Sequence, residues 1–420
     1  MSELGWKYLT QADKDAILRG IEDGVAYGGP YHVEIHPADR CNIDCFFCST
    51  AALRGTDEVP MPRFAELLGE LKEAGTRSLR LSGGGEPLFH RRIKDFLAAI
   101  QTSGLPIENL TTNAVLLRSE IAELLVGTCD QITVSLNTAD AESYAAMMQT
   151  PPRNFQRVVD NTRALVDLRR RRGAKRPRVT VQFLVWKENF RTIPEMYRLA
   201  REIGADGILF NGLSFLKPEQ KMTPAETEEM MALYEQVLKI DEYRRIINIG
   251  SYEQDLTSWL TPIQQRIGAE RSGLSLAAKA ARFLSRSDFT LREKVDHFVK
   301  QARHRRTRRV SESFESYCLI GWHSLLIRTT GAVAPCCILQ GKELGNVYRQ
   351  SLRDVWHGEA YGRFRAELSR IMREKADWKA DEGRDQTVDS LCGAHGGCPI
   401  ATFYYQSDKP FLRSYNRVLG

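Results

Sequence analysis

Hydrophobic and polar positions alternate with two different periods along the first half of the chain. Short apolar runs with a period of two predict strands, and longer runs with a period near 3.6 predict helices. Between residues 31 and 212 the two kinds of run follow each other in turn. The predicted strands span 31–36, 78–83, 107–113, 131–137, 178–186 and 207–212. The predicted helices span 9–24, 62–75, 91–104, 118–127, 154–172 and 193–204.

This alternation predicts a parallel sheet that is covered by helices. Six β/α units suit a partial barrel, and chemistry is then expected at the carboxyl ends of the strands. We therefore predict an α/β protein with a partial (β/α)6 TIM-like barrel over residues 31–215. A leading helix is expected within residues 1–30.

The second half of the chain lacks this alternation. Residues 216–312 are predicted to form a helical insertion without strands. The run SLLIRTTGAVAPCC, residues 324–337, predicts a β-hairpin that turns at Gly331. A helix is predicted over residues 351–372. Residues 313–420 are therefore expected to form a small α+β domain.

Length and composition set limits on the class of protein. The chain has 420 residues, of which 42% are hydrophobic, enough for one large core and a smaller second domain. No apolar run approaches the roughly 20 residues that are needed to span a bilayer. The N-terminus lacks the basic and apolar regions of a secretory signal. We therefore expect a cytoplasmic protein with no transmembrane segment.

The charge of the chain is unevenly placed. The net charge is +6, yet residues 262–310 alone hold 13 Arg or Lys and 4 Asp or Glu. This basic segment, with the amphipathic stretch 272–287, suits an anionic carrier, a phosphorylated substrate or a membrane surface. The arginine runs 169–172 and 304–309 raise the question of nucleic acid. No aromatic-interleaved basic groove accompanies them, so nucleic acid is not the expected partner.

The nine cysteines point to metal or catalytic chemistry. An odd number in a protein of this size argues against a disulfide framework. Three of them lie in the loop CNIDCFFC, residues 41–48, directly after the first predicted strand. Three thiolates on a four-iron cluster leave one iron open for a ligand, whereas a closed zinc site needs a fourth ligand, for which His36 is the nearest candidate. Cys129 is expected to be a buried apolar residue.

A second motif accompanies this loop. The sequence SGGGEP, residues 82–87, ends the second predicted strand. A CxxxCxxC loop followed by such a glycine turn resembles the radical S-adenosylmethionine (SAM) superfamily, over roughly residues 30–213. The resemblance implies that Cys41, Cys45 and Cys48 ligate a [4Fe–4S] cluster whose open iron chelates SAM.

The resemblance also implies which residues hold SAM. Glycines allow main-chain groups to approach a ligand closely, and a carboxylate can accept an ammonium group. The expected cofactor-binding residues are Phe47 beside the adenine, Gly83, Gly84, Gly85, Glu86, Ser135, Asn137 and Gln182, with Asn113 as a weaker candidate. Ser135 and Asn137 could equally be polar groups of the barrel interior. Glu34 and His36 share one strand face and are expected to form an interior pair rather than to contact substrate.

The C-terminal cysteines suggest a second cluster. The spacing from Gly331 to Cys336 and the run GNVYRQSLRDVW, residues 345–356, resemble SPASM and twitch domains. The resemblance implies an auxiliary [4Fe–4S] cluster held by Cys318, Cys336, Cys392 and Cys398. Cys337 is the candidate catalytic residue, as a hydrogen-atom donor, although it could also replace a ligand or merely pack. A zinc knuckle is the alternative for this group.

The resemblance implies a radical reaction. SAM is cleaved reductively to a 5′-deoxyadenosyl radical, which abstracts hydrogen from an unactivated C–H bond. Only about thirty residues precede the first strand, too few for a leader-binding domain. We therefore expect oxidation or epimerisation of a small molecule in specialised metabolism: a sugar, aminocyclitol, nucleoside or amino-acid derivative. The electron donor is expected to be a flavodoxin or ferredoxin.

Three other functions stay open from the sequence. Peptide crosslinking or epimerisation is the first alternative, and nucleic-acid modification is the second. The third is an iron–sulfur sensor or scaffold without catalysis. The glycine turn and Phe47 argue against a sensor, because a sensor needs no SAM pocket.

Overall fold

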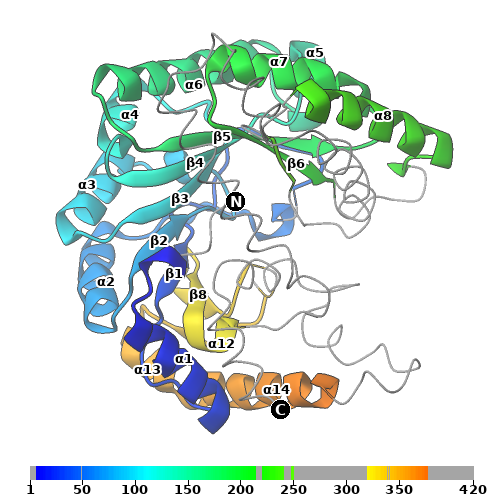
Figure 1. Ribbon diagram of the computed structural model, residues 1–420. Coiled ribbons are helices and arrows are strands. Elements are labelled where there is room, and N and C mark those ends of the chain that lie inside the picture. Colours follow the sequence, from blue (N-terminus) through cyan, green and yellow to red (C-terminus); the bar gives the residue numbers. More distant parts are fainter. Residues whose placement is uncertain are drawn as a thin grey trace, which may run out of the picture.

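The computed structural model describes residues 6–48, 50–213, 220–240, 247–249, 319–337, 339 and 341–376 (Figure 1). In this part of the chain ten strands form one sheet in the order β10-β9-β8-β1-β2-β3-β4-β5-β6-β7. Neighbouring strands from β8 through β1 to β7 run parallel, and β9 and β10 are antiparallel to their neighbours. The curved parallel sheet confirms the α/β partial barrel that the alternation of elements predicts.

The strands match the sequence prediction closely. All six predicted barrel strands form, and their ends differ from the prediction by no more than two residues. The strands are β1 His32–Ile35, β2 Ser78–Leu81, β3 Ile107–Thr112, β4 Cys129–Ser135, β5 Arg178–Val185, β6 Gly207–Gly212, β7 Ile247–Ile249, β8 Ser324–Ile327, β9 Ala332–Ala334 and β10 Gly345–Asn346.

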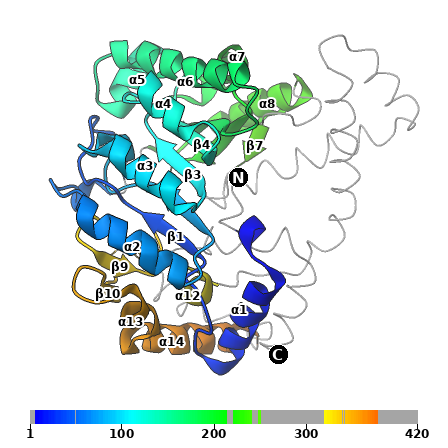
Figure 2. The ribbon, with the colours of Figure 1, turned by 90° about the vertical axis from the view of Figure 1, so that its left-hand side faces the viewer.

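Helices follow the strands and cover the outer face of the sheet (Figures 1 and 2). The α-helices are α1 Gln11–Asp23, α2 Met61–Glu73, α3 Ile93–Ser103, α4 Ser119–Leu125, α5 Ala141–Met148, α6 Arg153–Arg171, α7 Ile193–Ile203, α8 Pro224–Ile240, α12 Ile320–His323, α13 Leu352–His357 and α14 Glu359–Ala376. Short 3-10 turns are η1 Trp6–Tyr8, η2 Ala51–Leu53, η3 Pro87–Phe89 and η4 Phe190–Thr192. None of the helices described is long and apolar enough to cross a membrane.

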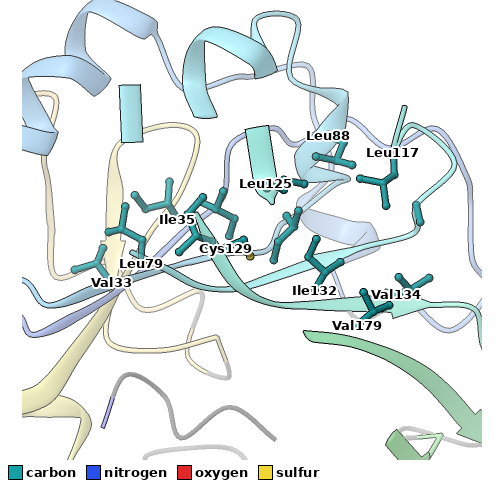
Figure 3. Close-up of a cluster of buried hydrophobic side chains, with 14 of the residues drawn as sticks. Val33, Ile35, Leu79, Leu88, Leu117, Leu125, Cys129, Ile132, Val134 and Val179 are labelled. Carbon is teal, nitrogen blue, oxygen red and sulfur yellow. The ribbon is translucent and has the colours of Figure 1, made fainter. Parts of the chain in front are cut away.

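The hydrophobic core lies between the sheet and the outer helices. Strand side chains such as Val33, Leu79 and Ile132 are fully buried there, with helix residues such as Leu125 (Figure 3). Successive side chains of a strand point to opposite faces. The intervening positions of β1 and β2, among them Glu34, therefore face the inside of the barrel, so the concave face is polar where the outer face is apolar.

Two helix predictions need correction. Helix α5 was not predicted; its N-cap is Asp140, whose carboxylate accepts a hydrogen bond from the Ser143 amide at 2.8 Å. The helix predicted over residues 351–372 is wrong as a single helix. It divides into α13 and α14 at Gly358, whose backbone is extended with φ −70° and ψ 169°.

The prediction that residues 216–312 contain no strand is also wrong. Strand β7 pairs in parallel with β6, with Ile208 opposite Ile247. The short Ile-Asn-Ile run suits an edge strand, because β-branched residues favour extended backbone. Helix α8 agrees with the predicted helical content. The amphipathic stretch 272–287 and the arginine run 304–309 lie outside the described residues.

The predicted C-terminal hairpin is confirmed and joins the barrel. Strands β8 and β9 turn at Gly331, which has φ 78°. Strand β8 pairs in parallel with β1, with Leu325 opposite Val33, so the hairpin continues the barrel sheet. The indole of Trp322 donates to the Val25 carbonyl at 3.0 Å and fastens this end of the chain to the N-terminal segment. The domain boundaries themselves stay predictions.

Candidate functional site

The cysteine loop lies between β1 and α2, at the carboxyl end of the first barrel strand. Its three cysteines are partly buried and form no disulfide. Two main-chain hydrogen bonds hold the loop against the end of α5: Asp44 donates to Met148 at 3.2 Å, and Phe46 donates to Met147 at 3.4 Å. The loop is therefore positioned by a helix that lies a hundred residues further along the chain.

The thiols of this loop are costly to ionise without a bound cation. Burial, together with the neighbouring Cys41 and Cys48, raises the pKa of Cys45 to about 12. Burial likewise raises the pKa of Cys41. Metal binding must displace the thiol protons, and positive charge between the sulfurs offsets their mutual repulsion. The donor set therefore fits a cationic metal group.

A single zinc ion at this loop would need a fourth ligand beside the three thiols. In the part of the chain that the structure describes, no three His, Cys, Asp or Glu side chains converge as ligands of one metal ion. His36, the fourth ligand considered for zinc, has its Nε2 3.4 Å from the Glu34 carboxylate. Each iron of a cubane takes one thiolate, so three cysteines without a fourth ligand fit a cluster with one open iron.

The glycine turn after β2 packs directly on the cysteine loop. Gly85 donates to the Ala38 carbonyl at 3.1 Å, and Glu86 donates to the Arg40 carbonyl at 2.8 Å. A Cβ on Gly85 would lie 2.0 Å from the Arg40 oxygen, and one on Gly83 would lie 2.5 Å from the Gly85 oxygen. Side chains are therefore excluded, and the backbone of the turn lies beside the loop.

Gly84 and the cysteines are also joined through a side chain. The Thr50 hydroxyl donates to the Gly84 carbonyl at 3.0 Å and lies 3.3 Å from the Cys48 sulfur. A Cβ on Gly84 would lie 2.9 Å from one carboxylate oxygen of Asp39. The predicted glycine turn and the predicted cluster loop thus form one site.

Glu86 is buried at the edge of this site. Its carboxylate accepts hydrogen bonds from the Thr112 hydroxyl at 2.5 Å, the Asn113 amide at 2.8 Å and the Leu88 amide at 3.1 Å. Burial nevertheless raises the pKa of Glu86 to about 7. A nearby ammonium group would favour the ionised form, so this carboxylate fits the predicted cationic ligand.

Asn137 is brought to the cysteine loop from the end of β4. Its backbone adopts a left-handed conformation with φ 62°, and its side chain is only 1% exposed. The Nδ2 atom lies 3.7 Å from the Met148 sulfur, which is also 3.7 Å from the Cys45 sulfur. The buried Oδ1 atom has no hydrogen-bond partner among the described residues, so it is available to a ligand.

The other predicted SAM residues are less closely tied to the loop. Ser135 and Gln182 are opposite each other on β4 and β5, and both are partly exposed. Asn113, the weaker candidate, donates to the Asn42 side chain at 2.8 Å, and its Nδ2 atom lies 3.9 Å from the Cys41 sulfur. The structure thus brings Asn113 to the cysteines and leaves the roles of Ser135 and Gln182 as predictions.

Phe47 belongs to an aromatic group on the loop. Its ring contacts Phe46 edge-on, with centroids 5.5 Å apart, and Phe46 contacts Trp186 at 5.0 Å. Trp186 directly follows β5 and was not singled out from the sequence. Only its place at a strand end could have indicated a role, because barrel chemistry gathers there.

Glu34 forms the expected interior pair with His36. Glu34 also accepts a hydrogen bond from Ser82 and lies 3.9 Å from the Arg80 guanidinium. These contacts lower its pKa to about 2, although burial alone would raise it. The carboxylate is therefore charged, and the concave face carries a fixed ionic group.

The C-terminal candidates are only partly described. Cys336 and Cys337 follow β9 and are partly exposed. Cys318, Cys392 and Cys398 lie outside the described residues, so the auxiliary ligand set stays a prediction. Cys129 is fully buried in the hydrophobic core, as predicted.

Two parts of the chain match known protein families. Residues 35–200 match the radical SAM superfamily, and residues 318–382 match SPASM, an iron–sulfur cluster-binding domain. The first range contains the cysteine loop, the glycine turn and Asn137. These two domains imply SAM, a [4Fe–4S] cluster and auxiliary cluster binding.

Curated relatives match part of the barrel. A probable GTP 3′,8-cyclase of Methanosarcina mazei is 28% identical over 141 residues, which cover 32% of this chain and 41% of the relative. The GTP 3′,8-cyclase of Rhodopirellula baltica is 31% identical over 141 residues, covering 32% and 38%. The tungsten-containing aldehyde ferredoxin oxidoreductase cofactor-modifying protein of Pyrococcus furiosus is 27% identical over 184 residues, covering 43% and 51%. The chain thus spans about two fifths of the cyclases' length.

Solved structures share the fold. Streptococcus suis SuiB bound to SAM has a TM-score of 0.56 and 18% identity, with 85% of this chain and 72% of that chain covered. Native anSMEcpe with bound SAM and a peptide has a TM-score of 0.52 and 13% identity, with coverages of 92% and 95%. By these matches, the chain carries a radical SAM domain over residues 35–200 and a C-terminal SPASM domain over residues 318–382.

Proposed function

We propose that the chain binds a [4Fe–4S] cluster through Cys41, Cys45 and Cys48 and holds SAM against it for radical chemistry. One observation carries this proposal: the cysteine loop and the glycine turn are joined by main-chain hydrogen bonds from Gly85 and Glu86. Such rigid joining suits a site in which cluster and ligand must contact each other.

The residues of the chain have separate tasks in this proposal. Glu86 accepts the ammonium group of SAM, and Asn137 offers its unpartnered Oδ1 atom to the ligand. Phe47 packs beside the adenine, and the bare backbone of the glycine turn allows close approach. When bound and reduced, cluster and SAM supply a 5′-deoxyadenosyl radical that abstracts hydrogen from a C–H bond.

We propose a small polar molecule as the substrate, which is oxidised or epimerised in the cytoplasm. The charged concave face, with Glu34 and Arg80 only partly buried, favours a hydrophilic ligand over an apolar one. The curated relatives named for GTP chemistry are compatible with a nucleoside or sugar derivative. Cys337 is the proposed hydrogen-atom donor in an epimerisation.

The proposed radical chemistry also requires an electron donor and involves a second cluster. A flavodoxin or ferredoxin supplies the electron. Cys318, Cys336, Cys392 and Cys398 hold the auxiliary cluster, within a domain that begins near residue 313. The basic segment 262–310 meets an anionic carrier or a phosphorylated substrate.

Peptide modification is the second candidate. SuiB, which has this fold, has been solved with its precursor peptide. Fold likeness alone does not transfer a substrate. Product mass in heavy water separates the outcomes: a loss of two hydrogens indicates oxidation, and one solvent deuterium without other change indicates inversion.

The assay for the proposed function is 5′-deoxyadenosine formation. The full chain is reconstituted anaerobically with iron and sulfide, then mixed with dithionite and SAM. We expect 5′-deoxyadenosine and about eight iron atoms per chain if both clusters form. A reconstituted protein that holds iron but forms no 5′-deoxyadenosine would favour a sensor instead.

A further inference from the structure

Two buried side-chain atoms beside the glycine turn have no hydrogen-bond partner among the described residues. One is Oδ1 of Asp39, and the other is Nδ1 of His36. Both side chains are almost completely buried, with Asp39 3% exposed and His36 1% exposed. A buried polar atom without a partner is rare, because the hydrogen bonds that it made to water are not replaced. The two atoms together therefore call for an explanation.

These two atoms border one point at Gly84, the central glycine of the turn. A Cβ on Gly84 would lie 2.9 Å from Oδ1 of Asp39 and 3.9 Å from Nδ1 of His36. The imidazole and the carboxylate thus approach the same place, although neither is hydrogen-bonded to the other. Because glycine has no side chain, it leaves Oδ1 uncovered, and any larger residue would crowd this oxygen.

The other polar atoms of both side chains are engaged, which fixes how the two groups are oriented. Oδ2 of Asp39 accepts a hydrogen bond from the Thr329 hydroxyl at 2.6 Å. Nε2 of His36 lies 3.4 Å from the Glu34 carboxylate, which can only accept. We therefore assign the proton of the neutral imidazole to Nε2, so that Nδ1 is an acceptor. The pair at Gly84 consists of two acceptors.

Two acceptors, one of them on a carboxylate, favour a ligand that donates hydrogen bonds and carries positive charge. A primary ammonium group has this chemistry, because it offers three N–H donors and no acceptor. A metal ion suits the place less well, since no three His, Cys, Asp or Glu side chains of the described residues are arranged to hold one. The place also adjoins the cluster loop: the Thr50 hydroxyl donates to the Gly84 carbonyl at 3.0 Å and lies 3.3 Å from the Cys48 sulfur.

We propose that Asp39 and His36 bind a primary ammonium group of a ligand, at the place that Gly84 leaves open. Two molecules of the proposed function can supply this group. SAM has an amino group, which Glu86 and the new pair would share. An aminated substrate, such as an aminocyclitol or an amino-acid derivative, would bring a second one. The choice between these sources rests on the proposed function, whereas the ammonium site rests on the contacts at Gly84.

The first test asks whether SAM is the source. Equilibrium dialysis of the reconstituted full chain compares SAM with the analogue that has hydrogen in place of its amino group. If SAM fills the site, Asp39→Asn and His36→Leu should each weaken SAM binding about tenfold and leave the analogue unaffected, because a hydrogen bond to a charged group is lost. His36→Gln keeps an acceptor and should weaken SAM binding less than His36→Leu.

The second test uses a small probe of the same chemistry. Methylammonium chloride has N–H donors, whereas tetramethylammonium chloride has the same charge and none. The thermal midpoint of the reconstituted full chain should be higher in methylammonium, because a ligand that binds only the folded state stabilises it. Asp39→Asn and His36→Leu should lose this difference. Saturating SAM abolishes the difference if SAM fills the site and leaves it if the amine belongs to the substrate.

Matched variants separate this effect from general disturbance. Asp130→Asn changes a buried carboxylate near the start of β4, and His32→Gln changes a buried imidazole at the start of β1, both at the other end of the sheet. Both controls should keep the SAM affinity and the methylammonium response. Gly84→Ala covers Oδ1 without changing either acceptor, so it should lose the response, and it serves if Asp39→Asn fails to fold.

The outcomes separate failure of this inference from failure of the proposed function. If Asp39→Asn, His36→Leu and Gly84→Ala all keep the wild-type SAM affinity and methylammonium response, the two acceptors bind only water and the inference is overturned. It is overturned as well if wild type distinguishes neither SAM from the analogue nor methylammonium from tetramethylammonium. If the variants lose the methylammonium response but wild type forms no 5′-deoxyadenosine, the ammonium site stands and the proposed function fails.

Discussion

The carboxyl group of Glu86 sits among three hydrogen-bond donors and is 3% exposed, with no cation beside it in the described chain. Its pKa is raised from 4.5 to about 7 by burial. A raised pKa means that the folded protein binds this proton more tightly than the unfolded chain does. The proton therefore contributes stability that is full below pH 4.5 and is lost as the pH rises through 7.

This linkage predicts how iron-free protein responds to pH. Between pH 5 and pH 8 the free energy of unfolding of wild type should fall by about 2.5 kcal/mol more than that of Glu86→Gln. Urea denaturation at several pH values measures both, and the glutamine variant controls for all other titrating groups. Parallel curves for the two proteins would contradict the raised pKa.

Gly85 gives a steric prediction at the same scale. A Cβ at this position would meet the Arg40 carbonyl oxygen at 2.0 Å, so Gly85→Ala must displace the turn or the cysteine loop. We expect a loss of about 1–3 kcal/mol in the free energy of unfolding and reduced iron retention. Gly69→Ala, on α2 with open space around its Cβ, is the matched control and should be neutral or slightly stabilising. Equal behaviour of the two variants would show that the turn does not pack on the loop.

Helix α5 is the element that holds the cysteine loop in place. Its C-terminal residues Met147 and Met148 accept the main-chain hydrogen bonds of the loop, and Tyr144 lies on its buried side. The helix is short, so its stability depends on its N-cap, Asp140. Weakening the cap should therefore loosen the loop as well as the helix.

This dependence can be tested with two capping residues. Asp140→Ala removes the cap of α5, and Ser351→Ala removes the cap of α13, where the Ser351 hydroxyl accepts from Asp354 at 3.1 Å. Each should cost about 1 kcal/mol of stability. Only Asp140→Ala should speed the release of iron to a chelator, followed by absorbance. If both variants release iron at one rate, α5 does not govern the loop.

The sequence allowed the barrel elements to be predicted because their periodicity is regular. Each barrel strand alternates or is β-branched, and each predicted helix has an apolar stripe, so local pattern and final structure agree. Helix α5 and the break at Gly358 were missed, since a short helix and a glycine within an amphipathic run carry weak local signals. Strand β7 was missed because three residues gain their strand character from pairing with β6.

The site residues that lie in short contiguous motifs could be predicted from the sequence. The site residues that only the fold brings together could not. The cysteines and the glycine turn are each contiguous in sequence. Met148, Arg54 and Trp186 meet the loop only through the packing of α5, η2 and β5 around it. No spacing within the sequence reports such contacts, because they depend on tertiary structure.

At the scale of the whole molecule, the C-terminal hairpin is part of the barrel sheet that carries the cysteine loop. Strand β8 continues the sheet beside β1, and the Thr329 hydroxyl donates to the buried Asp39 carboxylate at 2.6 Å. Asp39 in turn lies beside Gly84 of the glycine turn. A buried hydrogen bond therefore joins the two matched domains close to the site.

Removing that hydrogen bond should affect both halves together. Thr329→Val leaves a buried carboxylate with one partner fewer, which we expect to cost about 1–3 kcal/mol in the free energy of unfolding. SAM should also bind more weakly, because the Asp39 carboxylate beside Gly84 is then free to shift; equilibrium dialysis of the reconstituted protein measures this. Thr227→Val, at a partly exposed position on α8 where the hydroxyl donates to the Thr223 carbonyl, is the control. Unchanged SAM affinity in a destabilised Thr329→Val protein would limit the contact to a structural role.

The central claim is that the cysteine loop and the glycine turn together form one cluster and SAM site. The most direct measurement is the EPR spectrum of the reduced, reconstituted protein with and without SAM, for wild type and Cys45→Ser. We predict that SAM changes the wild-type signal. Cys45→Ser should lose the SAM-responsive signal and should hold about four fewer iron atoms per chain than wild type. A Cys45→Ser protein with full iron and the same response to SAM would contradict the account.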